Sequence, residues 1–381
     1  MNRLVATLLL LCPATALAQD NPLAAASADD ESGAWEEDDG ARILGWTRDA
    51  HGRPAPIING DDANVDDFAS AGGLVAEGTA FGLTAKLFMC SSTLIAPDVV
   101  LTAAHCVDFE TLVQQQYGMT LDALDFHFTR ADDLTHYQLG FNDPLPEDAV
   151  RATSWTWSDD WVGATMIRVG LSANNDIGLL FLEEPIYDVP LAILPTPEEA
   201  ELIAEGDPVW AVGWGQTTPV QGGAAGTKQM GESFIAELAG PEFKVGHERT
   251  DVRKCHGDSG GPSYWDLEES DSIDLQRQIG ITSHAYDTTD CNETGGVDTR
   301  VDYHLDWIND AMIEACEDGT RSWCPEDDDG EPLEWGILEA PMPQVDDERG
   351  GVCGCSSSQA PATGAFWLVG LAMLGLRRRQ R

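Results

Sequence analysis

Short apolar runs separated by turn residues fill the middle of the chain, from residue 57 to about residue 300. Their length and spacing predict β-strands, and the rhythm favours β-barrels over alternating strands and helices. From Val301 to Ala315 the apolar residues recur at helical spacing, so we expect a closing helix. The clearest strand-like runs are Gly82–Met89, Val99–Thr102, Met166–Val169, Val209–Val212 and Gln278–Thr282.

The first 56 residues lack this pattern. Arg3, an apolar stretch from Leu4 to Leu11 and the small residues around Ala18 predict a signal peptide over residues 1–18. Residues 19–56 are acidic and rich in Ala, Gly and Pro, which predicts a propeptide or linker without regular structure. We therefore expect an exported protein, in which disulfides persist.

The composition of the chain changes twice after residue 315. Residues 316–352 are acidic and contain proline, as expected of a solvated spacer. Residues 353–381 combine Cys353 and Cys355, an apolar run from Ala360 to Leu376 and three arginines. The run has about 17 residues, the lower limit for a transmembrane segment. This segment resembles the C-terminal sorting tags of myxobacteria and related bacteria, which implies membrane attachment at the cell surface or outer membrane, with or without later release. A plain tail anchor is the alternative.

The chain is strongly acidic. Asp and Glu number 66 against 21 Lys and Arg, a formal net charge of −45. This charge repels polyanions, so we exclude nucleic acid and anionic lipid surfaces as partners. The acidity can serve solubility in a salty medium, or acidic loops such as Asp266–Glu269 can bind calcium. No ordered calcium-loop motif supports the second explanation, and we expect no metal and no cofactor.

The most informative motif is at residues 255–262, which have the pattern C-x-G-D-S-G-G-P around Ser259. Flanking glycines leave a serine hydroxyl open to a substrate and allow backbone N–H groups to face its carbonyl. A serine hydroxyl needs a base, and His105 lies in the upstream motif T-A-A-H-C. Asp176, in N-D-I-G-L-L, is the candidate carboxylate that orients the histidine. The chain order His105, Asp176, Ser259 points to a double β-barrel.

These motifs resemble those of the trypsin/chymotrypsin family of serine endopeptidases, from Ile57 to Ala315. The resemblance implies an all-β fold of two six-stranded antiparallel β-barrels with a C-terminal helix. It extends to Ile57–Gly60, Cys90, Gly213–Gly215, Ser283, Gly296–Val301 and Asp306–Ile308.

The resemblance also implies a role for each site residue. The N–H groups of Gly257 and Ser259 would form the oxyanion hole, and Ser283 would hold Asp176 by a hydrogen bond. Cleavage before Ile57 would create an ammonium group that pairs with Asp258. The family disulfides would be Cys90–Cys106 and Cys255–Cys291, while Cys316 and Cys324 could close a local turn.

Two positions depart from the family pattern. Pro56, not Arg or Lys, precedes Ile57, so we expect an activating protease of different specificity or stepwise trimming. Arg253 stands where trypsin-like members carry an acidic residue, and Ala285 and Gly296 would form the pocket walls beside Ser283. A cationic pocket base would favour acidic P1 residues, whereas an Arg253 that turns away would leave a small apolar pocket. His284 replaces the usual tryptophan in the strand that pairs with substrate.

The sequence thus predicts an exported serine endopeptidase that acts on proteins or peptides and does not cut after Lys or Arg. The alternative is a catalytically silent protein of the same fold that acts as a binding protein. The intact set of His105, Asp176 and Ser259 argues for the enzyme.

Overall fold

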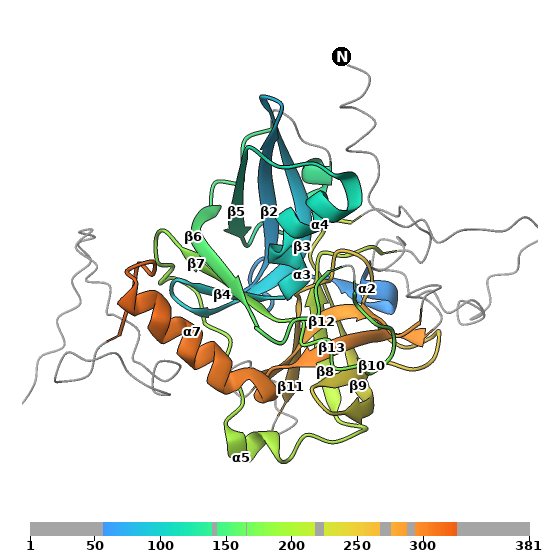
Figure 1. The fold of residues 1–381 in the computed structure, drawn as a ribbon. Helices are drawn as coiled ribbons and strands as arrows, with labels where there is room; N and C mark the ends of the chain where they lie inside the picture. Colours follow the sequence, from blue (N-terminus) through green and yellow to red (C-terminus); the bar gives the residue numbers. More distant parts are fainter. Residues whose placement is uncertain are drawn as a thin grey trace, which may run out of the picture. The chain divides into compact units, whose positions relative to one another are not determined.

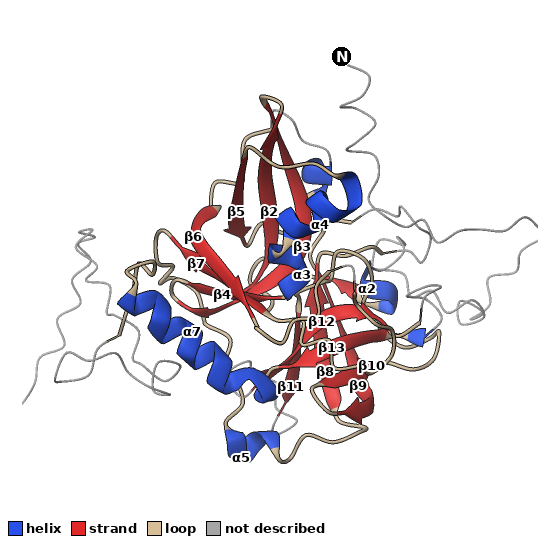
Figure 2. Cartoon of the chain, viewed as in Figure 1, coloured by secondary structure: helices blue, strands red, loops and turns tan. Residues whose placement is uncertain are grey.

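The computed structural model describes residues 56–138, 143–164, 166–217, 225–266, 276–287 and 294–325. Strands dominate this part of the chain (Figure 2) and every strand pair is antiparallel. The expected signal peptide, the linker before residue 56 and the cysteine motif with its apolar segment lie outside the described residues.

Six strands close into a first barrel in the order β2-β3-β4-β7-β6-β5. Strand β4 is buried along its whole length and pairs with β7 so that Thr102 lies opposite Gly178. His105 follows β4 and Asp176 precedes β7, so this register brings both residues to the same edge of the barrel. The strands are β2 (Ala71–Ala80), β3 (Leu83–Ala96), β4 (Val99–Thr102), β5 (Ala123–Thr129), β6 (Val150–Trp157) and β7 (Gly178–Leu182).

A second six-stranded barrel follows in the chain. Its strands are ordered β9-β10-β13-β12-β11-β8, and the pairing of β8 with β9 closes it, while the short β1 (Asp61–Asp62) adds to β9. The two closed barrels confirm the predicted fold class. The strands are β8 (Pro208–Gly213), β9 (Gln229–Ala239), β10 (Glu242–Val245), β11 (Pro262–Asp266), β12 (Gln276–Ala285) and β13 (Gly296–Arg300).

Short helices connect the strands, and one longer helix lies near the end of the described chain (Figure 1). Helix α7 (Leu305–Glu317) buries Leu305, Ile308, Met312 and Ala315 on one face, which belongs to a large apolar cluster with residues of both barrels. The predicted closing helix is confirmed, although it is preceded by a 3-10 turn, η4 (Asp302–His304). The other helices are α2 (Pro56–Asn59), α3 (Ala104–Val107), α4 (Phe109–Tyr117), η2 (Thr135–Gln138) and α5 (Pro197–Ala200).

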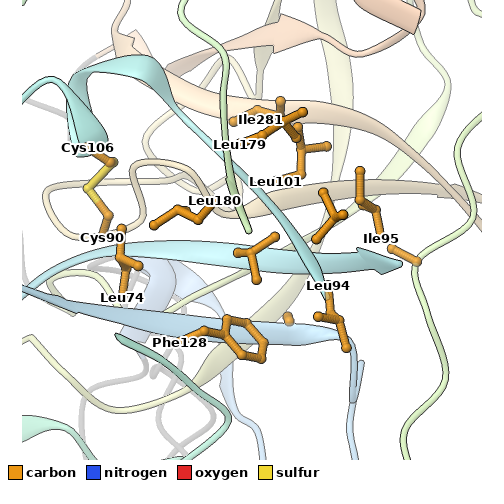
Figure 3. Packing of buried hydrophobic residues seen from close by; sticks show 14 of the residues in the cluster. Leu74, Cys90, Leu94, Ile95, Leu101, Cys106, Phe128, Leu179, Leu180 and Ile281 are labelled. Atoms are coloured by element: carbon orange, nitrogen blue, oxygen red, sulfur yellow. A yellow bond between two sulfur atoms is a disulfide. The ribbon is translucent and has the colours of Figure 1, made fainter. Parts of the chain in front are cut away.

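The core of the first barrel holds the histidine segment in place. Figure 3 shows Leu74, Leu94, Leu101 and Phe128, which come from different strands and are buried together. Complete burial of one such side chain contributes about 1.5–3 kcal/mol. The disulfide between Cys90 of β3 and Cys106 of α3 ties the helix that carries His105 to this core.

The prediction of a strand at Met166–Val169 was wrong. Met166 is 66% exposed and Val169 is 48% exposed, so these apolar side chains do not face a core. The backbone N–H and C=O of Arg168 bond to the side chain of Asn174 instead of to a neighbouring strand. This local pairing makes a loop where the composition alone indicated a strand.

Candidate active site

Ser259 lies on a tight turn that approaches the end of β4. A Cβ on Gly260, whose φ is +78°, would lie 2.1 Å from Thr102 Oγ1 and 2.3 Å from the Ser91 carbonyl, so only glycine fits there. The N–H of Ser91 donates to the Ser259 carbonyl at 2.8 Å. These contacts bring the serine turn against the segment that leads into His105.

His105 and Asp176 form a close pair. Nδ1 of His105 lies 2.7 Å from Asp176 Oδ2, and the backbone N–H of His105 donates to Oδ1 at 2.9 Å. Ser283 Oγ donates to Oδ2 at 2.6 Å, and Thr299 Oγ1 donates to the Asp176 carbonyl at 3.1 Å. The carboxylate is completely buried, whereas the imidazole keeps 19% exposure. The pair thus fixes one ring nitrogen and leaves the imidazole partly open to a reactant.

Electrostatics favour the charged pair. Burial disfavours the imidazolium, but the charge and hydrogen bond of Asp176 outweigh it and raise the pKa of His105 above 6.5. Burial likewise opposes the charge of Asp176, but His105 and Ser283 hold the pKa of that carboxyl below its ordinary value. A histidine with a raised pKa beside an ionised carboxylate can accept a proton and return it.

The predicted oxyanion donors are available. Within the described residues, the N–H groups of Gly257 and Ser259 donate to no acceptor. The N–H of Gln216 holds the His256 carbonyl at 2.7 Å, so the N–H of the same trans peptide, at Gly257, is directed the opposite way. Ser91 Oγ donates to the Gly257 carbonyl at 2.9 Å and fixes the next peptide.

Asp258, the residue before the serine, is completely buried. Its carboxylate accepts the N–H groups of Gly215 and Cys255, both at 2.8 Å. Burial raises its pKa to about 6, and these two hydrogen bonds only partly oppose that rise. Ile57 is also completely buried, and Ile58 forms a β-bridge with Arg253, so the expected activation segment is docked beside the serine loop.

Arg253 is completely buried. Its guanidinium donates to the backbone carbonyl of Arg249 at 2.7 Å and to that of Asp251 at 3.3 Å. The neighbouring Lys254 forms a fully buried ion pair with Asp298 of β13, with 2.7 Å between Nζ and Oδ2. Both cations at the expected pocket base are therefore bound by groups of the protein itself.

The expected pocket walls are neighbours. Ala285 of β12 and Gly296 of β13 are register partners, and a Cβ on Gly296 would lie 3.5 Å from Lys254 Cβ. His284, between Ser283 and Ala285, lies with Nδ1 2.9 Å from Ser283 Oγ and Nε2 3.0 Å from the Gly170 carbonyl. His284 therefore contacts the same hydroxyl that donates to Asp176.

Disulfides link Cys90 to Cys106 and Cys316 to Cys324. Cys255 is disulfide-bonded, and its expected partner, Cys291, lies outside the described residues. Potential metal-ligand atoms of Cys90, Cys106 and His105 lie within 4.8 Å of one another, but the disulfide removes both thiolates as ligands. No helix in the described ranges is both long and apolar enough to cross a bilayer.

Ser91 and Asp298 were not recognised as site residues from the sequence. Ser91 bonds both the serine turn and the N–H of Trp214, yet in the sequence it is one of several small polar residues in a strand. Asp298 lies in β13, which is buried along its whole length, so its carboxylate requires a cationic partner.

Comparison with known proteins agrees with this geometry. A family model described as Trypsin matches residues 57–308. Kallikrein-11 of Homo sapiens is 26% identical over 235 residues, which cover 59% of this chain and 72% of that protein. Chymotrypsin of Phaedon cochleariae is 26% identical over 231 residues, 58% of this chain and 70% of that protein. Chymotrypsin-C of Bos taurus is 27% identical over 243 residues, 58% of this chain and 78% of that protein. The chain therefore belongs to the trypsin family and is a serine endopeptidase.

Proposed function

We propose that this endopeptidase works through Ser259, His105 and Asp176. Ser259 Oγ attacks the scissile carbonyl carbon while His105 Nε2 takes the hydroxyl proton. The leaving amine receives that proton as the C–N bond breaks, and an acyl ester remains on Ser259. Water, deprotonated by His105, then attacks the ester carbonyl; the bond to Ser259 Oγ breaks, and Oγ takes the proton back from His105. The 2.7 Å contact between His105 Nδ1 and Asp176 Oδ2 carries this proposal, because it holds the ring in the tautomer that leaves Nε2 free to act as base.

The N–H groups of Gly257 and Ser259 bind the oxyanion that forms on the carbonyl oxygen. Their lack of an acceptor in the described chain and the hydrogen bonds on the adjoining carbonyls support this role. Loss of a single oxyanion donor typically costs about 10²–10³ in rate.

The enzyme prefers small, uncharged P1 side chains. Arg253 donates to two backbone carbonyls and Lys254 is neutralised by Asp298, which argues against a free cation for an acidic P1 residue. Among the described residues at this base, Asp298 is already paired with Lys254 and so offers no unpaired carboxylate to a basic P1 residue. Of the two pockets that the sequence left open, we therefore favour the small apolar one.

Cleavage of the Pro56–Ile57 bond by another protease completes the site. The new Ile57 ammonium pairs with Asp258, whose raised pKa marks a buried carboxyl that lacks a sufficient cationic partner before cleavage. The disulfides Cys90–Cys106 and Cys316–Cys324 support an exported protein. A signal peptide at residues 1–18 and membrane attachment through residues 353–381 complete the proposal.

Reaction with a serine-directed phosphonate probe tests the mechanism. Residues 53–56 are replaced by a recognition sequence for a site-specific protease, so that cutting frees Ile57. We expect the cut protein to be labelled on Ser259, and the Ser259→Ala and His105→Ala variants to remain unlabelled. Failure of the correctly cut, folded protein to react would overturn the mechanism and favour a silent binding protein.

A further inference from the structure

Glu242 makes an unusual set of hydrogen bonds. It is the first residue of β10 in the second barrel, and its side chain is completely buried. The carboxylate accepts three consecutive backbone N–H groups from the first barrel's loop: Ser172 at 2.5 Å, Ala173 at 3.0 Å and Asn174 at 2.7 Å. Successive N–H groups directed at one anion form a strong and geometrically specific site.

The loop that Glu242 holds is strained. Ala173 and Asn175 both have φ near +53°, a left-handed conformation that residues with a Cβ rarely adopt. Such conformations persist only where the surrounding structure over-determines them. Glu242 supplies that constraint, because its two oxygens bind the N–H groups on both sides of the Ala173 backbone turn.

This loop ends at the carboxylate that orients His105. Asp176 comes two residues after Asn174, and its carbonyl accepts a hydrogen bond from Thr299 of β13. The segment from 172 to 176 is therefore bound to the second barrel at both ends, by Glu242 before Asp176 and by Thr299 at Asp176 itself.

We propose that Glu242 is a positioning residue for catalysis: by binding three N–H groups of the 172–174 turn, it fixes the position from which Asp176 reaches His105. The proposal rests on the triad mechanism above. Glu242 is outside the motifs that identify the family, and in the described part of the chain its carboxylate bonds the 172–174 turn and not His105 or Ser259.

The chemistry of the contact requires a carboxylate. Oε2 accepts from Ser172 and Ala173, and Oε1 accepts from Asn174. In Glu242→Gln one oxygen becomes an NH₂ group, which must face at least one N–H donor and cannot accept from it. In Glu242→Asp both oxygens remain but the side chain is one methylene shorter, so the turn is held less closely. Glu232→Gln is a matched control, because Glu232 is an exposed glutamate on neighbouring β9.

The test compares peptide hydrolysis by these variants in the full chain cut before Ile57. We expect Glu242→Gln to lose about 10- to 100-fold in kcat with little change in KM, because small misplacement of catalytic groups has effects of this size. The acid limb of the kcat/KM profile should move to lower pH, because His105 loses part of the Asp176 contact that raises its pKa. Glu242→Asp should fall between Glu242→Gln and wild type, and Glu232→Gln should stay within about twofold of wild type.

A second readout does not depend on turnover. In a Ser259→Ala background, the His105 ring is titrated by NMR with and without Glu242→Gln or Glu242→Asp. A lower His105 pKa in these variants supports the proposal even if no peptide substrate is cleaved, which separates it from failure of the triad mechanism. Folded Glu242 variants with wild-type kcat and an unchanged His105 titration would overturn it. If Glu242→Gln does not fold, the same two measurements on Glu242→Asp decide.

Discussion

At the residue scale, the site depends on buried charges that are satisfied by several partners each. Asp176 accepts hydrogen bonds from the His105 backbone, the His105 ring and Ser283. A buried carboxylate remains ionised only when such partners offset its loss of hydration. This is why the pKa of Asp176 lies below its ordinary value although burial alone would raise it.

In the uncleaved chain, burial outweighs the hydrogen bonds to Asp258 and raises its pKa. The stability of the folded protein therefore depends on pH. The pKa of Asp258 is about 6 in the folded protein, against about 3.9 in an unfolded chain. Between these values the folded state binds more protons than the unfolded state, so the free energy of unfolding falls as pH rises. The loss is roughly 3 kcal/mol and is complete above about pH 7.

Cleavage should remove this loss, because the Ile57 ammonium favours the charged carboxylate. Urea unfolding of Ser259→Ala protein between about pH 4 and pH 8, uncut and cut before Ile57, measures the effect. We expect the uncut chain to lose stability relative to the cut chain as pH rises through this window. Parallel curves would show that Asp258 does not respond to the new terminus.

At the element scale, residues 318–325, which follow α7, pack as part of the folded protein. Arg321 and Asp98 form a fully buried ion pair, with 2.6 Å between Nη2 and Oδ1, and the N–H of Trp323 donates to the same carboxylate at 2.9 Å. Asp98 lies in the turn between β3 and β4, the strand that leads to His105. The folded chain therefore extends beyond residue 315, where the sequence placed the end of the protease domain.

Removal of one partner of this pair should be costly. Arg321→Ala leaves Asp98 buried without its cation, and we expect a loss of about 3–5 kcal/mol in the free energy of unfolding. The double variant Arg321→Met with Asp98→Asn removes both charges and should recover part of that loss. Urea denaturation of the single and double variants measures the coupling. A single-variant loss below about 1 kcal/mol would mean that water reaches Asp98.

The elements that the sequence predicted well are those with both an apolar pattern and clear boundaries. Val99–Thr102 matches β4, and the helical spacing after Val301 marks α7. Met166–Val169 has the composition of a strand, but the side chain of Asn174 bonds its backbone. The elements α4, β5 and β6 are not among the strands or the helix expected from the sequence. Strand β5 does alternate, with Leu124, Phe126 and Phe128 apolar and polar residues between them, so the sequence carried its pattern although it was not singled out.

At the scale of the whole molecule, the proposed active site is assembled from both barrels. His105 and Asp176 come from the first barrel, while Ser259, Ser283 and Thr299 belong to the second. The motifs around His105, Asp176 and Ser259 are each continuous in the chain, so the sequence indicates them directly. The roles of Ser91, Glu242 and Thr299 arise only when distant strands meet, and an isolated Ser, Glu or Thr gives no local signal of such contacts.

The central claim is that Ser259 cleaves peptide bonds in protein cut before Ile57, with small uncharged residues at P1. A P1-diverse peptide library, incubated with the cut protein and read by mass spectrometry, tests both parts at once, with Ser259→Ala as the control. We expect cleavage that is absent from the control and that follows small apolar residues. Cleavage mainly after Asp or Glu would contradict the pocket assignment. No cleavage above the control, from folded protein with a free Ile57 terminus, would contradict the catalytic account itself.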